Sequence, residues 1–372
     1  MRRPFRNILA QGLLTAVLIL AAASGCGRGA RPTPAGPVIG VKIYEHPGPF
    51  GPLVDEWRGL GVNTVFAGES LARNADFRGL VRSNGLTLYL IFPVFQDPEA
   101  VKADPGLAAM TAAGTPARDE WVEFVCPARE DFLGRRVDEL RRAVTAADPD
   151  VVSLDFIRYF VFWEKVAPDR TPASLPQTCF CPVCLAGFEK DMGFRVPADL
   201  ATTPEKADWI LDRHAAEWTE WKCRTIARAV ERLAAAARAA KPGIRVNLHA
   251  VPWREADFGG GAASVAGQDL ARLAPLVDMV SPMAYHHMVG RDPAWVHSVV
   301  EDFARRTKTP VLASIQVSNA YVETELPPAE FRAALVEALK PPSVGVVLWS
   351  WDALSKSPEK MRILRSLVGL KK

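Results

Sequence analysis

An aspartate stands inside one of the most apolar stretches of the chain. Asp155 follows the run Val-Val-Ser-Leu and precedes Phe-Ile-Arg158-Tyr159. A carboxylate among apolar residues is unfavourable unless it is paired or used in chemistry, and Arg158 is near enough in sequence to be its partner. The pattern predicts either a structural Asp–Arg pair or a catalytic nucleophile or general base that Arg158 keeps ionised and oriented.

Chemistry with two carboxyl groups needs a second acid near Asp155. The acids that follow other apolar runs are Glu45, Glu69, Asp97, Glu255, Asp257 and Asp352. We choose Glu255 as the general acid, because Trp253 beside it would shield it from water and raise its pKa. The alternative for each of these acids is an ordinary solvated position in a loop.

Aromatic and hydrogen-bonding side chains gather at the ends of the same apolar runs. Flat rings suit the apolar faces of sugars, and polar neighbours suit their hydroxyl groups. The expected substrate contacts are Tyr159, Asn247, His249, Trp253, Tyr285, His286, Gln316, Trp349 and Trp351. Core packing is the alternative for at least half of them. The histidines form no His-x-His or His-Glu-x-x-His motif, so we expect neutral hydrogen-bonding roles rather than a catalytic metal site.

Four cysteines have spacings that suit a metal ion. Cys179, Cys181 and Cys184 fall within six residues, and Cys126 precedes them in another segment without clear periodicity. Four thiolates form a closed tetrahedral zinc site, which would be structural because no position is left for water. A disulfide is the alternative, favoured by an oxidising compartment. We expect Cys223, inside a long amphipathic segment, to be a buried free thiol.

Eight short apolar runs alternate with longer amphipathic segments from residue 38 onward. We expect strands at 38–44, 63–67, 86–94, 151–157, 245–251, 277–284, 310–317 and 343–350. We expect helices at about 52–60, 71–84, 129–147, 206–240, 267–274, 293–307, 327–340 and 357–368. Continuous apolar strands separated by helices indicate a buried parallel sheet, and eight such units predict an α/β fold with a single (β/α)8 TIM barrel. A doubly wound sheet, the alternative, rarely needs eight units.

Two connections in this barrel are unusually long. They follow the third and fourth strands, at 96–128 and 160–205. Both lie at the carboxyl ends of the strands, where barrel enzymes build their active sites, and the zinc site would join them. Asp155 falls at the same end of the fourth strand.

Two resemblances to known families rest on these residues. Cys126-Pro and Cys179-Phe-Cys-Pro-Val-Cys184 resemble the zinc-binding cluster of family 42 glycoside hydrolases, which are β-galactosidases. That family has an Asn-Glu pair on strand four where this chain has Leu154-Asp155, so its catalytic acid does not carry over. The motifs LDFIRY, SPMAY and GVVLWSWD resemble the glycoside-hydrolase-like (β/α)8 barrels of bacterial lipoproteins. This second resemblance implies a barrel with Asp155 as the catalytic carboxylate.

The N-terminus resembles a bacterial export signal. Three arginines precede an apolar run, and Ala-Ser-Gly-Cys26 is similar to the lipobox in which the cysteine is acylated. We expect a signal peptide at 1–25, lipidation of Cys26, a flexible Gly/Pro-rich tether at 26–37 and the barrel domain at 38–372. An ordinary signal peptide or an uncleaved anchor is the alternative. The expected location is therefore the periplasmic side of the envelope or the cell surface, with the lipid as the only membrane contact.

Charge and composition restrict the partners. The formal net charge of the 372 residues is +3, and the three arginines of the export segment account for it. A neutral body gives no electrostatic reason to bind nucleic acid. We expect no organic cofactor, and no Gly-x-Ser-x-Gly motif indicates a serine hydrolase. The function expected is a glycoside hydrolase for an oligo- or polysaccharide; the alternative is a carbohydrate-binding lipoprotein without activity.

Overall fold

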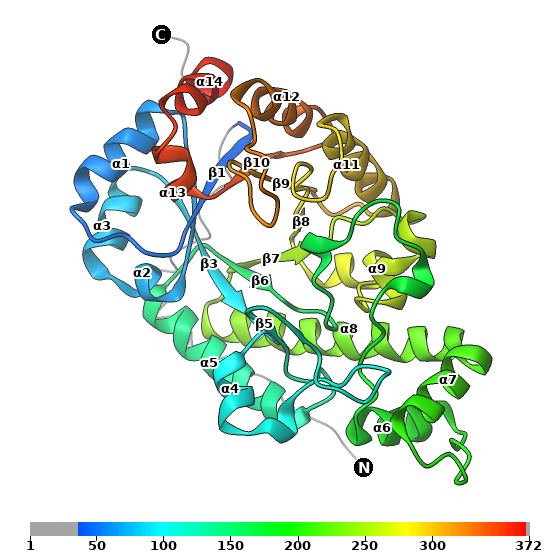
Figure 1. The fold of residues 1–372 in the computed structure, drawn as a ribbon. Coiled ribbons are helices and arrows are strands. Elements are labelled where there is room, and N and C mark those ends of the chain that lie inside the picture. Colours follow the sequence, from blue (N-terminus) through cyan, green and yellow to red (C-terminus); the bar gives the residue numbers. More distant parts are fainter. Residues whose placement is uncertain (1–35, 370–372) are drawn as a thin grey trace, which may run out of the picture.

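The structure is a computed structural model that describes residues 36–369. Eight parallel strands form a barrel surrounded by helices (Figure 1). In barrel order they are β1 (Val38–Ile43), β2 (Thr64–Ala67), β3 (Thr87–Pro93), β6 (Val151–Asp155), β7 (Arg245–Ala250), β8 (Met279–Pro282), β9 (Ala313–Gln316) and β10 (Gly345–Trp349). The predicted (β/α)8 fold is confirmed, with every predicted strand present and shortened by one to four residues.

The barrel closes between β8 and β9. Val280 N donates to Pro310 O at 3.0 Å and Leu312 N donates to Val280 O at 2.9 Å. These bonds complete the ring, because β1 already pairs with both β2 and β10. Two strands that are four places apart in this ring lie on opposite sides of it, so the loops after β3 and β9 face each other across the mouth.

The larger helices follow the strands as expected. They are α1 (Phe50–Gly59), α3 (Ala75–Ser83), α5 (Glu130–Ala147), α8 (Ala215–Ala240), α11 (Ala294–Arg306), α12 (Pro328–Leu339) and α14 (Pro358–Val368). The segments expected as single helices at 71–84 and 206–240 are each divided. Asn74 ends α2 (Glu69–Arg73) and caps α3 by accepting from Phe77 N at 3.0 Å, while His214 separates α7 (Thr203–Arg213) from α8.

Short elements complete the chain. The loop after β3 contains α4 (Pro98–Ala103) and the two-stranded hairpin β4 (Arg118–Asp119) and β5 (Val122–Glu123). The loop after β6 contains α6 (Pro182–Met192). Later come α9 (Gly261–Ser264), α10 (Leu270–Leu273) and α13 (Trp351–Ser355), together with short 3-10 turns.

None of the helices between residues 36 and 369 combines the length and the apolar character needed to cross a membrane. The predicted export signal, Cys26 and most of the tether lie outside the described residues.

Candidate active site

A pocket of about 250 Å³ lies at the carboxyl ends of the strands. Its lining comes from the ends of four strands and from the long loops. The lining residues are Lys42, Tyr44, Trp121, Asp155, Phe156, Glu164, Met283, Tyr285, Tyr321 and Trp349. The barrel therefore brings together one amine, two carboxyl groups and a set of aromatic rings.

Asp155, at the end of β6, is held as a carboxylate. Its Oδ1 accepts from Phe156 N at 2.8 Å, and its Oδ2 lies 3.4 Å from His249 Nδ1. Burial opposes ionisation, but His249, Lys42 and the Phe156 N–H together hold the pKa of Asp155 well below its usual range. Burial and the charge of Lys42 lower the pKa of His249, while the neighbouring Asp155 acts in the opposite direction.

Glu164 is the second carboxyl group of the pocket. It lies in a short 3-10 turn, Trp163–Lys165, of the loop after β6. Its Oε2 atom is buried and has no hydrogen-bond partner among the described residues. Burial raises the pKa of Glu164 to about 7, against the opposing charge of Arg158. At neutral pH this carboxyl group carries a proton for much of the time, unlike Asp155.

Lys42 supplies the amine, from inside β1. Its side chain is buried, and its Nζ donates to the Tyr285 hydroxyl at 3.1 Å. Burial lowers the pKa of Lys42 to about 8, while the charges of Asp155 and Glu164 act in the opposite direction. Lys42 thus supports the ionised state of Asp155 from within the barrel.

Arg158 is buried beside the pocket without pairing directly with Asp155. Its guanidinium lies 4.8 Å from the centre of the Phe124 ring and 5.4 Å from that of Phe156. Its Nε and Nη1 atoms have no hydrogen-bond partner among residues 36–369. Burial lowers the pKa of Arg158, while Glu164 and Asp155 raise it. Its charge therefore acts on both carboxyl groups, and the contact that orients Asp155 comes from His249.

Aromatic rings form the walls of the pocket. Tyr285 and Trp349 stack with their ring centres 5.0 Å apart and their planes inclined by 15°. Tyr44, Trp121 and Tyr321 are 40%, 48% and 39% exposed, and they are three of the four exposed large apolar side chains among the described residues. Exposed rings concentrated around one pocket indicate a binding surface for a ligand with flat apolar faces.

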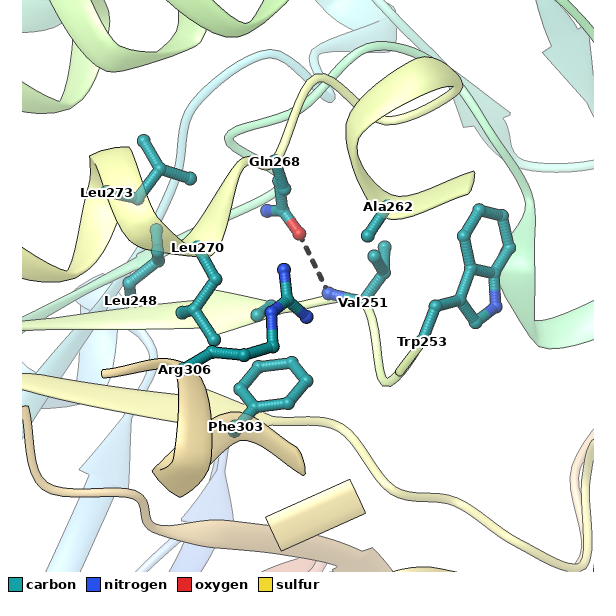
Figure 2. A pocket seen from close by; sticks show the side chains of 10 residues that line it. Leu248, Val251, Trp253, Ala262, Gln268, Leu270, Leu273, Phe303 and Arg306 are labelled. Carbon is teal, nitrogen blue, oxygen red and sulfur yellow. Dashed lines mark hydrogen bonds between the residues drawn. The ribbon is translucent and has the colours of Figure 1, made fainter. Parts of the chain in front are cut away.

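The structure places Glu255, the acid chosen from the sequence, outside this pocket. Its carboxylate is 61% exposed and pairs with Arg305 of α11 at 3.0 Å. Trp253, expected to shield it, instead lines a small separate space of about 10 Å³ with Leu248, Gln268 and Arg306 (Figure 2). The chain after β7 turns outward toward α11, so neither residue reaches Asp155.

The remaining expected contacts divide into pocket and supporting residues. Tyr285 and Trp349 line the pocket, and His249 contacts Asp155. Five others do not line it. Asn247 forms hydrogen bonds with Ser153 and Ser281 inside the barrel. Gln316 accepts a hydrogen bond from Met288 N, and His286 contacts Glu330. Trp351 packs edge-on against Trp57, and the centre of the Tyr159 ring lies 4.9 Å from Lys222 Nζ.

The four cysteines expected to bind a metal ion do come together. The sulfur atoms of Cys126, Cys179, Cys181 and Cys184 all lie within 4.8 Å of one another and are buried. Cys126 Sγ is 3.3 Å from Cys184 Sγ and 3.5 Å from Cys181 Sγ, and Cys179 Sγ accepts from Met110 N at 3.1 Å. Four thiolates around a zinc ion at about 2.3 Å would be about 3.8 Å apart, so the cluster can hold a metal ion with small adjustments.

Several pocket residues were missed from the sequence. Lys42 and Glu164 are charged residues inside the apolar runs VIGVKIY and FVFWEK. A charged residue in an apolar run is the signal by which Asp155 was recognised, and it could have identified these two residues as well. Trp121 and Tyr321 lie in loops without periodicity. Only the folded chain shows that these loops meet over the pocket.

Comparisons with known proteins agree with the barrel. No family model and no curated protein matches the sequence. Among solved structures, the glycoside hydrolase domain of PgaB (BpsB) from Bordetella bronchiseptica is similar with a TM-score of 0.68 and 16% identity, over 91% of this chain and 100% of that one. The β-galactosidase from Marinomonas ef1 gives 0.66 and 11%, and a catalytic mutant of Gan42B, a GH42 β-galactosidase from G. stearothermophilus, gives 0.60 and 12%.

In both galactosidase comparisons the matched region covers 89% of this chain, but only 59% and 56% of the two galactosidases. At these identities the likeness shows the fold alone. The protein therefore has a (β/α)8 barrel fold similar to the barrels of these glycoside hydrolases, and the likeness of fold does not by itself give the activity.

Proposed function

We propose that the protein is a glycoside hydrolase that uses Asp155 and Glu164 on an oligo- or polysaccharide. The observation that carries this proposal is that two carboxyl groups line one pocket and have pKa values displaced in opposite directions. Such a pair provides an acid and an ionised base or nucleophile at the same pH. Glu164 takes the role that the sequence alone had suggested for Glu255.

The roles follow from the two protonation states. Glu164 donates its proton to the glycosidic oxygen as the bond to the anomeric carbon breaks. Asp155 either attacks the anomeric carbon or removes a proton from the attacking water. Lys42 and His249 are positioning residues that keep Asp155 ionised, and the stacked rings of Tyr285 and Trp349 offer a platform for a sugar ring.

The test is sugar release from envelope and plant polysaccharides and from aryl glycosides. The purified protein is compared with Asp155→Asn, Glu164→Gln and Glu255→Gln. We expect turnover by the parent and by Glu255→Gln, which changes an exposed carboxylate outside the pocket. Loss of about 10²–10⁴-fold is expected for Glu164→Gln, the usual contribution of a general acid.

A sugar-binding protein without activity is the rival. Binding of a glycan by the parent and by both pocket variants, with turnover by none, would establish that function and withdraw the catalytic roles. Full activity of Asp155→Asn would place the chemistry elsewhere.

We assign the cysteine cluster a structural zinc ion. A buried set of four thiols that joins the loops after β3 and β6 supports this assignment. Zinc bound there would hold the segment that carries Trp121 against the segment that follows Glu164. Metal analysis of protein purified without added metal tests it, with one equivalent of zinc expected and none in Cys126→Ser.

The location proposed is the envelope, through a lipid on Cys26. The lipobox-like sequence and the arginine-rich apolar segment before it support this proposal. Mass spectrometry of the N-terminal peptide from cells tests it. A diacylated peptide that begins at Cys26 is expected, and the intact first 25 residues would contradict it.

A further inference from the structure

A hydrogen bond joins two loops from opposite sides of the barrel mouth. Trp121 stands at the turn of the β4–β5 hairpin after β3, and Tyr321 stands in the loop after β9. Trp121 Nε1 donates to the Tyr321 hydroxyl at 2.8 Å. Since both residues line the pocket, this bond makes them a roof across it.

An aromatic ring and two ion pairs hold the roof in place. The Phe162 ring meets both rings edge-on, at 6.2 Å from Trp121 and 5.0 Å from Tyr321. Lys165 Nζ pairs with Glu120 at 2.6 Å and with Asp119 at 3.2 Å. These ion pairs tie the hairpin to the residue next to Glu164, so the roof and the proposed acid belong to one connected unit.

The side of the mouth formed by β6, β7 and β8 is filled. Trp163, which is fully buried, packs against Tyr285 with ring centres 5.7 Å apart. Val166, Trp253 and Val289, from the loops after these three strands, line a space of about 10 Å³, which is too small for a sugar unit. A glycan chain therefore has no exit on this side.

The remaining exposed lining residue lies on the other side of the roof. Tyr44, just after β1, is 40% exposed, whereas Asp155 and Tyr285 are buried. The opening of the pocket is thus on the side of β10, β1 and β2, and the buried Asp155 lies at the inner end. The space is a blind pocket rather than a groove that crosses the mouth.

We infer that this pocket accepts the terminal unit of a glycan chain and excludes internal units. The inference rests on the proposed function for its sugar ligand, and it adds that Trp121 and Tyr321 determine which part of the chain enters. An internal unit would need chain on both sides of it, and the roof and the Trp163 loop occupy the second path. A hydrolase with this pocket releases one small product from chain ends.

The test measures binding against chain length. Asp155→Asn is titrated with chito-, cello- and galacto-oligosaccharides of two to six units and with their parent polymers, and tryptophan fluorescence is followed. Chain-end binding gives a Kd per mole of chains that is nearly independent of length beyond the first few units. Binding of internal units would strengthen in proportion to chain length, and that result would overturn the inference.

Two variants test the roof itself. Tyr321→Phe removes only the hydroxyl that accepts from Trp121, and Trp121→Ala removes the ring. Their matched controls are Tyr89→Phe, whose hydroxyl contacts Met279 near the amino ends of β3 and β8, away from the pocket, and Trp209→Ala on α7. We expect Trp121→Ala to bind polymers more tightly per sugar and to release a ladder of oligosaccharides, with a smaller change for Tyr321→Phe and none for the controls.

The outcomes separate this inference from the proposed hydrolase. A ladder of products from the parent protein at early times would overturn chain-end selection and leave hydrolysis standing. Length-independent binding without turnover would support the blind pocket and contradict hydrolysis. No binding of any glycan would overturn both.

Discussion

Glu164 gives a prediction in which stability and activity move in opposite directions. In Glu164→Gln the amide keeps the shape of the protonated carboxyl but cannot ionise or donate a proton as an acid. The folded protein raises the pKa of Glu164 from 4.5 to about 7, so ionising this group costs about 3 kcal/mol more in the folded chain than in the unfolded chain.

The sign follows from proton binding. Between pH 4.5 and 7 the unfolded chain has lost the Glu164 proton and the folded chain retains it, so the parent loses stability as the pH rises through this window. Glu164→Gln lacks this loss. The free energy of unfolding of the variant, relative to the parent, should therefore increase by about 3 kcal/mol between pH 4 and pH 8.

Urea unfolding at several pH values, followed by tryptophan fluorescence, measures this difference. Hydrolysis of the best glycan or aryl glycoside measures the second effect, a loss of about 10²–10⁴-fold in kcat. The parent should lose activity as the pH rises through about 7, because the acid form of Glu164 disappears. A stability difference that is constant with pH, or unchanged activity, would refute the reasoning. Glu255→Gln, exposed and paired with Arg305, is the control.

Other residues of the pocket and the cysteine cluster give further predictions. Lys42→Met should raise the pKa of Asp155, because a positive charge is removed, and the acidic limb of the pH–activity profile should move upward; an unmoved limb would contradict the role of Lys42. Trp349→Ala removes the ring stacked on Tyr285. Loss of a contact of about 1–1.5 kcal/mol between this ring and the sugar should raise KM about tenfold, and an unchanged KM would mean that this wall does not bind sugar. Cys126→Ser should release the metal ion and lower the Tm, measured by metal analysis and thermal unfolding; retained zinc and an unchanged Tm would exclude a structural site.

The barrel was predictable because its signals are local. Strands buried on both faces must be continuously apolar, and helices that cover them must be amphipathic, so the alternation from residue 38 onward specified the architecture. Asp155 was recognisable for the same reason, since a carboxylate in such a strand stands out. The cysteine cluster was recognisable from spacing, and the adjacency of the loops after neighbouring strands explains why Cys126 joins the other three.

The second carboxyl group was not predictable in this way. Glu255 and Glu164 both lie in loops after strands, and each has a tryptophan one or two residues before it. Their local sequences therefore share the features by which an acid can be selected from sequence. Only the path of each loop distinguishes them. The loop after β7 carries Glu255 outward to Arg305, and the loop after β6 carries Glu164 into the pocket. The partner of Asp155 was decided similarly, since His249 on the adjacent strand reaches it while Arg158 turns toward aromatic rings.

By itself, then, the sequence determined the repeating strands and helices, the cysteine cluster and the position of one carboxylate. The tertiary structure decided the partner of that carboxylate, the second acid, the buried Lys42 and the Trp121–Tyr321 roof. The physical reason is that burial pattern and spacing act along the chain over a few residues. The pKa of a carboxyl group and the shape of a pocket depend instead on which distant loops the closed barrel brings into contact.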